Sequence, residues 1–194
     1  MEYRLDKSGL LNRLSAWDSF LKRKVHLIAC GGTALTLLDI KPSTKDIDLI
    51  VPNETEYRYL INILGQLGYK QITGAGWSRE DGFIFDIFPG KRVHTTELLE
   101  SPLKEGNNIP VEEFSHIYLG VLNYYDLLIT KLIRSAAVDI EDCLTLIRHK
   151  HAEIDMDKFI KRYRETVSFD ISGEKADKNM DYFLKRLKKE RLWP

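Results

Sequence analysis

The stretch Thr44-Lys45-Asp46-Ile47-Asp48-Leu49-Ile50-Val51 sets two acidic residues at the start of an aliphatic run. The run has the composition of a strand, and residues i and i+2 of a strand point to the same side of the sheet. Asp46 and Asp48 are therefore expected to stand side by side, about 6 to 7 Å apart. Two carboxylates at that spacing repel each other, so a bound cation is favoured on a partly covered face.

A third acidic residue lies in a later apolar run, Phe83-Ile84-Phe85-Asp86-Ile87-Phe88. An unpaired charge is costly to bury there, so Asp86 is interpreted as a third ligand from a neighbouring strand. Mg²⁺ is usually held by a few carboxylates together with substrate phosphates, and two such ions can serve the attacking and the leaving oxygen. We predict that Asp46, Asp48 and Asp86 are catalytic and hold two Mg²⁺ ions, with Mn²⁺ as the alternative metal.

A double glycine precedes the acid pair. The apolar run of residues 25–30 ends in Gly31-Gly32-Thr33, which predicts a strand, a tight turn and the start of a helix capped by Thr33. Glycine lets the backbone approach a ligand closely, and helix N-termini attract phosphate. An ordinary strand-to-helix connection would look the same, and surface strands often end in acids. The order of the glycines, the acid pair and the later lone acid favours the functional interpretation.

Together these motifs resemble the polymerase-β-like nucleotidyltransferase superfamily. The segments 31–35 and 44–51 look most like its branch of AbiEii-type abortive-infection toxins and related uncharacterised proteins. A second block adds to the resemblance: residues 126–134 are similar to that branch's downstream lysine helix, and residues 139–142 to its acidic helix start. The resemblance covers roughly residues 25–150. It implies a small mixed sheet and transfer of a nucleoside monophosphate from an NTP.

The resemblance also implies roles for individual residues. The three aspartates would bind the metals, with Asp86 helping to activate the acceptor, and Gly31, Gly32 and Thr33 would contact phosphate. Lys131 would reach the nucleotide, and Asp142 would support that site. Members of the branch commonly carry an arginine between the glycines and the acid pair. This chain has none there, so we expect Lys41 or Lys45 to supply the charge.

The residues around Lys131 point to a special environment for this side chain. Tyr124, Leu127, Leu128 and Lys131 fall on one stripe of a helix, so the lysine interrupts an apolar face. Such a lysine either extends to the surface or has an anionic partner. Asp139 and Asp142 have a simpler alternative explanation, because acids near a helix N-terminus are favoured by the helix dipole.

The composition of the chain restricts the function classes that it can have. The chain has 194 residues, 43% of them hydrophobic, and its 29 basic and 29 acidic residues balance. This excludes a whole-protein attraction to nucleic acid or membrane, although the basic run 185–189 could contact RNA phosphates. The two cysteines, Cys30 and Cys143, lie far apart in apolar runs and suggest buried thiols. Without a signal peptide or a membrane-spanning run, the chain is expected to be cytoplasmic.

The expected fold is α/β (α+β): a small mixed β-sheet of the nucleotidyltransferase type flanked by helices, with a helical C-terminal part. We place the core at residues 1–121 and the helical region at 122–194. Helices are expected at 10–21, from 33, at 54–67, around Lys131, and at 139–149, 155–165 and 175–191. Strands are expected at 25–30, from 46, at 69–73, 83–88 and 116–121, with a short one at Trp77 and a loop at 101–110.

The resemblance implies a nucleotidyltransferase and suggests a tRNA 3′ end as the acceptor hydroxyl, in a toxin-like protein with a cognate antitoxin. A protein or a small molecule is the alternative acceptor. Two alternatives stay open. One is a non-catalytic module that binds a nucleotide or a partner, and the other is an antitoxin-like protein adenylyltransferase. Three mutually repelling carboxylates argue against the non-catalytic module.

Overall fold

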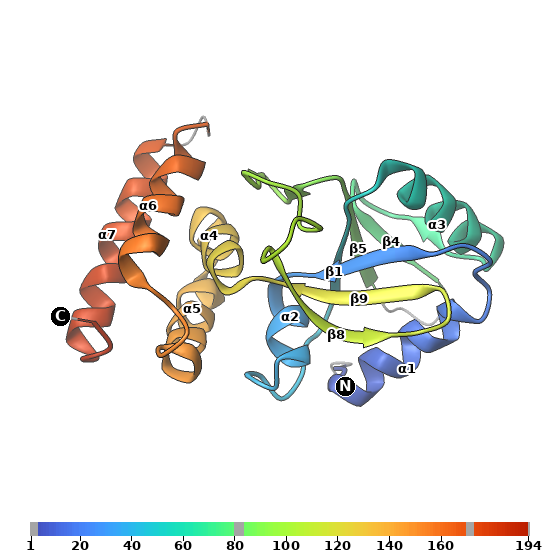
Figure 1. The fold of residues 1–194 in the computed structure, drawn as a ribbon, viewed down its shortest axis with the longest axis horizontal. Coiled ribbons are helices and arrows are strands. Elements are labelled where there is room, and N and C mark those ends of the chain that lie inside the picture. Colours follow the sequence, from blue (N-terminus) through green and yellow to red (C-terminus); the bar gives the residue numbers. More distant parts are fainter. Residues whose placement is uncertain (1–3, 80–83, 170–172, 194) are drawn as a thin grey trace.

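The computed structural model describes residues 4–79, 84–169 and 173–193 of the chain. Figure 1 shows the described elements as two parts, a sheet with its helices and a group of C-terminal helices. In chain order the elements are α1 (Lys7–Asp18), β1 (Val25–Ala29), α2 (Gly31–Leu37), β2 (Ile47–Val51), α3 (Glu54–Gln66), β3 (Lys70–Gln71), β4 (Gly76–Ser78), β5 (Ile84–Pro89), β6 (Arg92–Val93), β7 (Thr96–Glu97), β8 (Asn108–Glu113), β9 (Ile117–Leu122), α4 (Tyr124–Arg134), α5 (Ala137–Lys150), α6 (Met156–Val167) and α7 (Gly173–Lys189).

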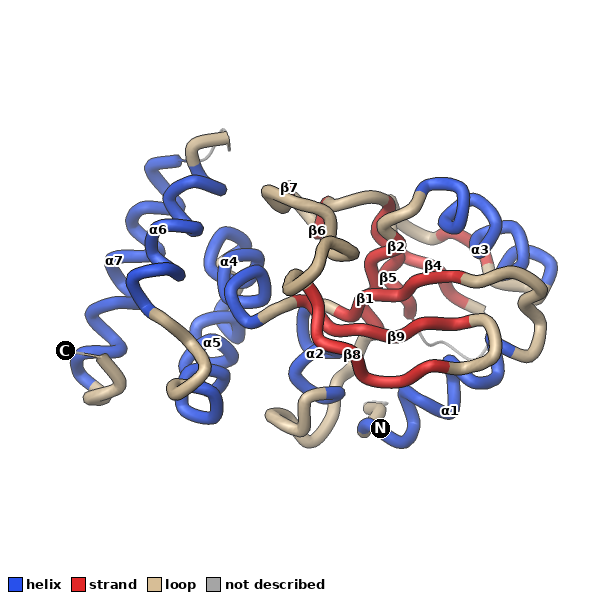
Figure 2. The backbone as a smooth tube through the Cα atoms, in the orientation of Figure 1, coloured by secondary structure: helices blue, strands red, loops and turns tan. Residues whose placement is uncertain are grey.

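The main sheet has the order β3-β4-β5-β2-β1-β9-β8, and β6 and β7 form a separate hairpin. Strand β2 pairs with β5 in parallel and with β1 antiparallel, while β1 pairs with β9 in parallel. Figure 2 shows these strands as one continuous sheet with the hairpin beside it. The sheet is therefore mixed, as the sequence predicts, and β2 and β5 lie next to each other at its centre.

The two faces of the central strands have different neighbours. Phe85 packs against the ring of Trp17 in α1, with ring centroids 4.4 Å apart. Its neighbours in β5, Asp86 and Phe88, point to the opposite face, because side chains alternate along a strand. There Phe88 meets the ring of His94 at 4.8 Å. The β6–β7 hairpin therefore lies on the face of the sheet that carries the aspartate side chains.

Several sequence expectations need correction. Asp46 lies just before β2 rather than within it. Strand β3 covers only two residues of the expected range 69–73. The expected loop at 101–110 ends in strand β8, which begins at Asn108, and the β6–β7 hairpin was not anticipated. Short strands at a sheet edge carry weak periodicity, so their pairing is decided by the neighbouring strand. The part of the expected strand at Phe83 lies outside the described residues.

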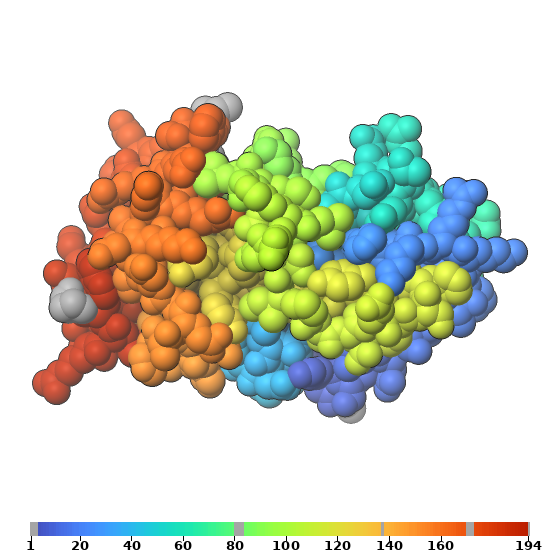
Figure 3. Space-filling view, viewed as in Figure 1, coloured from blue at the N-terminus to red at the C-terminus, as the bar shows by residue number. Residues whose placement is uncertain are grey.

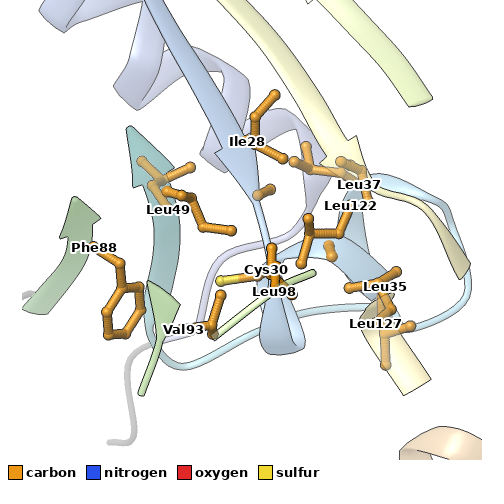
Figure 4. Packing of buried hydrophobic residues seen from close by; sticks show 14 of the residues in the cluster. Ile28, Cys30, Leu35, Leu37, Leu49, Phe88, Val93, Leu98, Leu122 and Leu127 are labelled. Atoms are coloured by element: carbon orange, nitrogen blue, oxygen red, sulfur yellow. The ribbon is translucent and has the colours of Figure 1, made fainter. Parts of the chain in front are cut away.

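One cluster of buried apolar side chains runs from the sheet into the helices α4 to α7. Figure 4 shows part of this core, to which the hairpin segment contributes Val93 and Leu98. In the space-filling view of Figure 3, the light-green segment that includes the hairpin covers the region between the C-terminal helices and the sheet. Within the described residues, every helix is too short or too polar to span a lipid bilayer.

Candidate active site

Asp48 and Asp86 are direct neighbours across the parallel pair of β2 and β5. The register pairs Ile47 with Phe85 and Asp48 with Asp86, so both carboxylates stand on the same face of the sheet. The side chain of Asp48 is 8% exposed, whereas Asp86 is half-buried and Asp46 is exposed. The strand register thus brings together two of the three predicted ligands, and Asp46 adjoins them at the start of β2.

Short contacts from the β1–α2 connection position Asp48. The Thr33 hydroxyl donates to the carbonyl of Asp46 at 3.1 Å and accepts from the backbone N–H of Asp48 at 2.9 Å. Thr33 is therefore not the N-cap of α2, which begins two residues earlier, after Cys30. Its hydroxyl is used inside the fold, because it holds the start of β2 against α2.

Two glycines leave room for the two carboxylates. A Cβ atom on Gly31 would lie 2.3 Å from Oδ2 of Asp48, and the φ angle of Gly31 is +58°. A Cβ atom on Gly76, which pairs with Asp86 from β4, would lie 3.1 Å from Oδ1 of Asp86. A side chain at either position would therefore crowd an aspartate.

Burial and neighbouring carboxylates raise the pKa of both Asp48 and Asp86. Burial raises the pKa of Asp48 to about 7, with further raising contributions from Asp86 and Asp46. Burial also raises the pKa of Asp86, as does the charge of Asp46. Arg134 opposes the rise at both Asp48 and Asp86. Ionising the whole set is thus unfavourable in the protein alone, and a cation would relieve this repulsion.

The donor set fits a hard divalent cation. Carboxylate oxygens are what Mg²⁺ prefers, and the glycines leave space beside them. In the part of the chain described here, however, no three Asp, Glu, His or Cys side chains have the geometry of a ready metal site. Asp46, which is exposed and directly precedes β2, is the third carboxylate that the sequence predicts for such a site.

Arg134, at the end of α4, links the aspartate face to helix α5. Its Nε and Nη2 donate to the two carboxylate oxygens of Asp139 at 2.9 and 2.7 Å. Its Nη1 donates to Nε2 of His94 at 3.0 Å. Burial tends to raise the pKa of Asp139, but the hydrogen bond from Arg134 and the charge of Lys131 outweigh it and lower that pKa.

Lys131 is buried among anionic partners. Its ammonium donates to Asp142 at 2.7 Å and to Asp139 at 3.4 Å, and its side chain is 2% exposed. Lys41 donates to the other oxygen of Asp142 at 2.8 Å. Of the two sequence alternatives for Lys131, the anionic partner is therefore correct. Direct contact of Lys131 or Lys41 with a nucleotide would require this ion cluster to open.

A cavity of about 880 Å³ adjoins Arg134, between the β6–β7 segment and the C-terminal helices. Its volume is in the range of small-molecule sites. Cationic side chains and His94 are prominent in the lining, and the exposed ring of Phe169 also contributes. One acidic residue, Glu97, also lines the cavity and pairs with Lys91 at 3.2 Å. The basic and aromatic residues of the lining include Lys91, Arg92, His94, Arg134, Phe169 and Lys175.

Sequence reasoning missed this cavity and its cations. Arg134 lies within residues 126–134, a block that the sequence singles out, and it follows Lys131 by one helical turn. The sequence therefore indicates that the two side chains lie close together. His94 and Lys175 have no comparable signal, because they come from segments far apart in the chain.

A mixed sheet that presents aspartates from two neighbouring strands beside a cation-lined cavity is an arrangement suited to nucleotidyl transfer. The family model "Nucleotidyltransferase of unknown function (DUF6036)" matches residues 12–191. The chain therefore belongs to the DUF6036 family of nucleotidyltransferases.

Two solved structures of ANT(2'')-Ia match the chain at low similarity. A crystal structure in complex with adenylyl-2''-tobramycin has a TM-score of 0.46 and 16% identity, covering 91% of this chain and 96% of that chain. The solution structure of the antibiotic-resistance factor ANT(2'')-Ia has the same TM-score and identity, covering 96% and 97%. Matches at this level of identity and TM-score carry no information about the acceptor of this chain. Among curated proteins, no sequence matches closely enough to count as a relative.

Proposed function

We propose that this chain is a Mg²⁺-dependent enzyme that transfers a nucleoside monophosphate from an NTP to an acceptor hydroxyl and releases pyrophosphate. The observation that carries the proposal is the placement of Asp48 directly beside Asp86 on adjacent parallel strands. Family membership supports the reaction type. The cation-lined cavity supports an anionic substrate.

Asp46, Asp48 and Asp86 would hold the metal in this proposal. When bound, Mg²⁺ supplies positive charge that offsets the charge of the phosphates and the carboxylates. Asp86 is our candidate to accept the proton of the acceptor hydroxyl, since its half-buried carboxylate stands beside Asp48 on the face that carries the aspartates. The hydroxyl oxygen then bonds to the α-phosphorus, and the bond to the β-phosphate breaks.

The phosphates are assigned to the backbone N–H groups of Gly31 and Gly32, as the sequence suggests. We do not assign a phosphate contact to the Thr33 side chain, because its hydroxyl already forms hydrogen bonds with the backbone of Asp46 and Asp48. Lys131 and Asp142 take an indirect role. Together with Arg134, Lys131 offsets the buried charge of Asp139, and this interaction holds helices α4 and α5 together beside the aspartates.

The acceptor that we propose is the 3′ hydroxyl of a tRNA. The resemblance to AbiEii-type toxins implies it, and helix α7 offers cations for an RNA backbone. Lys175, near the start of α7, lines the cavity, and the basic run 185–189 lies near the end of the same helix. Within this run, Arg186 is already paired with Glu141 and Glu190.

The test compares the wild type with Asp46→Asn. Each protein is incubated with Mg²⁺, one of four α-labelled NTPs, and total tRNA, cell protein or a set of aminoglycosides. Label in tRNA from the wild type alone supports the proposal and identifies the base. Label in protein would favour a protein adenylyltransferase. Label in an aminoglycoside would show that the acceptor is a small molecule. Binding of NTP without any labelled product would favour a non-catalytic module.

The toxin-like role is a separate part of the proposal. Transfer to tRNA would stop translation, so induced expression of the wild type should arrest growth while Asp46→Asn should not. Co-expression of the product of the neighbouring gene tests for a cognate antitoxin. Equal growth with the wild type and the variant would contradict the toxin role without touching the transfer reaction.

A further inference from the structure

Two partners hold the guanidinium of Arg134 in one orientation. Asp139 receives the Nε and Nη2 hydrogen bonds, and His94 receives one from Nη1 at 3.0 Å. A guanidinium group that donates two hydrogen bonds to one carboxylate has little rotational freedom left. Its remaining N–H groups are available to a ligand, since Arg134 lines the cavity and its side chain is 33% exposed.

His94 reaches Arg134 from an uncommon backbone conformation. Its φ angle is +51°, in the left-handed region that residues other than glycine rarely adopt. The residue directly follows β6, and its ring packs against Phe88, a neighbour of Asp86 on the same face of β5. Such conformations persist where the surroundings hold them, and they cluster at functional sites.

Arg134 acts on both the aspartates and the cavity. Its charge opposes the rise in the pKa of Asp48 and of Asp86, so it lies within electrostatic reach of the carboxylate pair. It also lines the cavity, together with Lys91, Arg92 and Lys175. The positive charge of this arginine, next to a metal held by the aspartates, favours a ligand that carries negative charge at that point. Phosphate oxygens meet the requirement, and guanidinium groups bind them with two hydrogen bonds.

We infer that Arg134 binds the β- and γ-phosphates of the NTP, which leave as pyrophosphate, and that His94 is the positioning residue that orients Arg134 for this contact. The inference rests on the proposed function and names a phosphate-binding residue for it. Nε2 of His94 accepts the hydrogen bond, so His94 must be neutral at this nitrogen. Burial and the charges of Arg134 and Lys131 lower the pKa of His94 and so favour its neutral state, while the charge of Asp139 opposes this shift.

Binding measurements test the inference without any turnover. Calorimetric titrations with tripolyphosphate, ATP and AMP are made with and without Mg²⁺, on the wild type and on Arg134→Gln. The control is Arg58→Gln, which removes the same charge from an exposed pair with Glu54 on α3. We expect Arg134→Gln to weaken tripolyphosphate and ATP by about 10- to 100-fold and AMP by less than about twofold. The control should bind all three like the wild type.

His94 is tested without disturbing the Arg134–Asp139 pair. Glycine suits a positive φ angle, so His94→Gly removes the ring without backbone strain, and His94→Gln restores an acceptor of similar reach. We expect His94→Gly to weaken tripolyphosphate about 3- to 10-fold and His94→Gln to recover most of this loss. A purely structural role for His94 would not give this recovery. Thermal melting of each variant reports its folding, and His94→Gly decides the question if Arg134→Gln does not fold.

Equal tripolyphosphate affinity in the wild type and a folded Arg134→Gln would overturn the assignment of Arg134. Unchanged or tighter binding by His94→Gly would overturn the positioning role. Both results would leave the labelling assay of the proposed function intact. Conversely, a wild type that binds tripolyphosphate through Arg134 but labels no acceptor would support the inference and contradict the transfer reaction.

Discussion

Asp48 of β2 stands directly opposite Asp86 of β5, on one face of two parallel strands. The two carboxylates come from positions far apart in the chain, and burial together with the charge of Asp86 raises the pKa of Asp48 to about 7. Burial is expensive for such a pair unless a cation or a proton compensates it.

Asp46→Asn should reduce nucleotidyl transfer by about 100-fold or more, because it removes one proposed metal ligand. The side chain is exposed, so the free energy of unfolding should change by no more than about 0.5 kcal/mol. The labelling assay and a urea titration measure the two effects. Asp39→Asn is the matched control, since Asp39 pairs with Lys7 away from the aspartates. Transfer at the wild-type rate by Asp46→Asn would refute the ligand role.

The stability of the metal-free protein should fall as the pH rises from about 4 to about 7. Asp48 has a pKa of about 7 in the folded state and 3.8 as its ordinary value, so over this window the folded protein keeps a proton that the unfolded chain has released. Its stabilising contribution is complete below pH 4 and lost above 7, on the order of 4 kcal/mol in total.

Urea titrations in EDTA across this pH range measure that loss in the wild type and in Asp48→Asn. The variant cannot ionise at this position, so its stability should decline less steeply with pH. Added Mg²⁺ should stabilise the wild type most at the high end of the range, where the carboxylate is already ionised. Parallel pH profiles for the two proteins would rule out the shifted pKa of Asp48.

Gly31→Ala should lower the free energy of unfolding by at least about 2 kcal/mol, because the new methyl group meets both an unfavourable φ angle and the Asp48 carboxylate. Gly65→Ala is the control. Gly65 lies within helix α3 with open space around it, so this change should stabilise the protein by about 0.5 to 1 kcal/mol. Thermal melts compare the two, and a neutral Gly31→Ala would mean that Asp48 can move aside.

Lys131→Met should destabilise the protein by about 3 to 5 kcal/mol, since it leaves Asp139 and Asp142 buried with one cation fewer. Lys104→Met removes a lysine from an exposed pair with Glu100 and should cost no more than about 1 kcal/mol. Denaturant midpoints of both variants provide the comparison. Similar midpoints would show that the buried cluster contributes little to stability.

The sequence by itself determined the local elements and the chemical character of the site. Period-two patterns predicted β2 and β5 and placed Asp48 and Asp86 among apolar neighbours, and the stripe around Lys131 predicted a helix whose apolar face is interrupted by a lysine. These features depend on residues close together in the chain, where backbone geometry alone decides which side chains share a face.

Only the tertiary structure decided which distant residues meet. The β2–β5 register set Asp48 against Asp86, the ion cluster engaged Lys41 with Asp142, and the β6–β7 hairpin brought His94 to Arg134. Thr33 likewise proved to hold the start of β2 rather than to cap α2. Such contacts depend on how the sheet and the helices pack around a shared core, and no local pattern of one sequence records that packing.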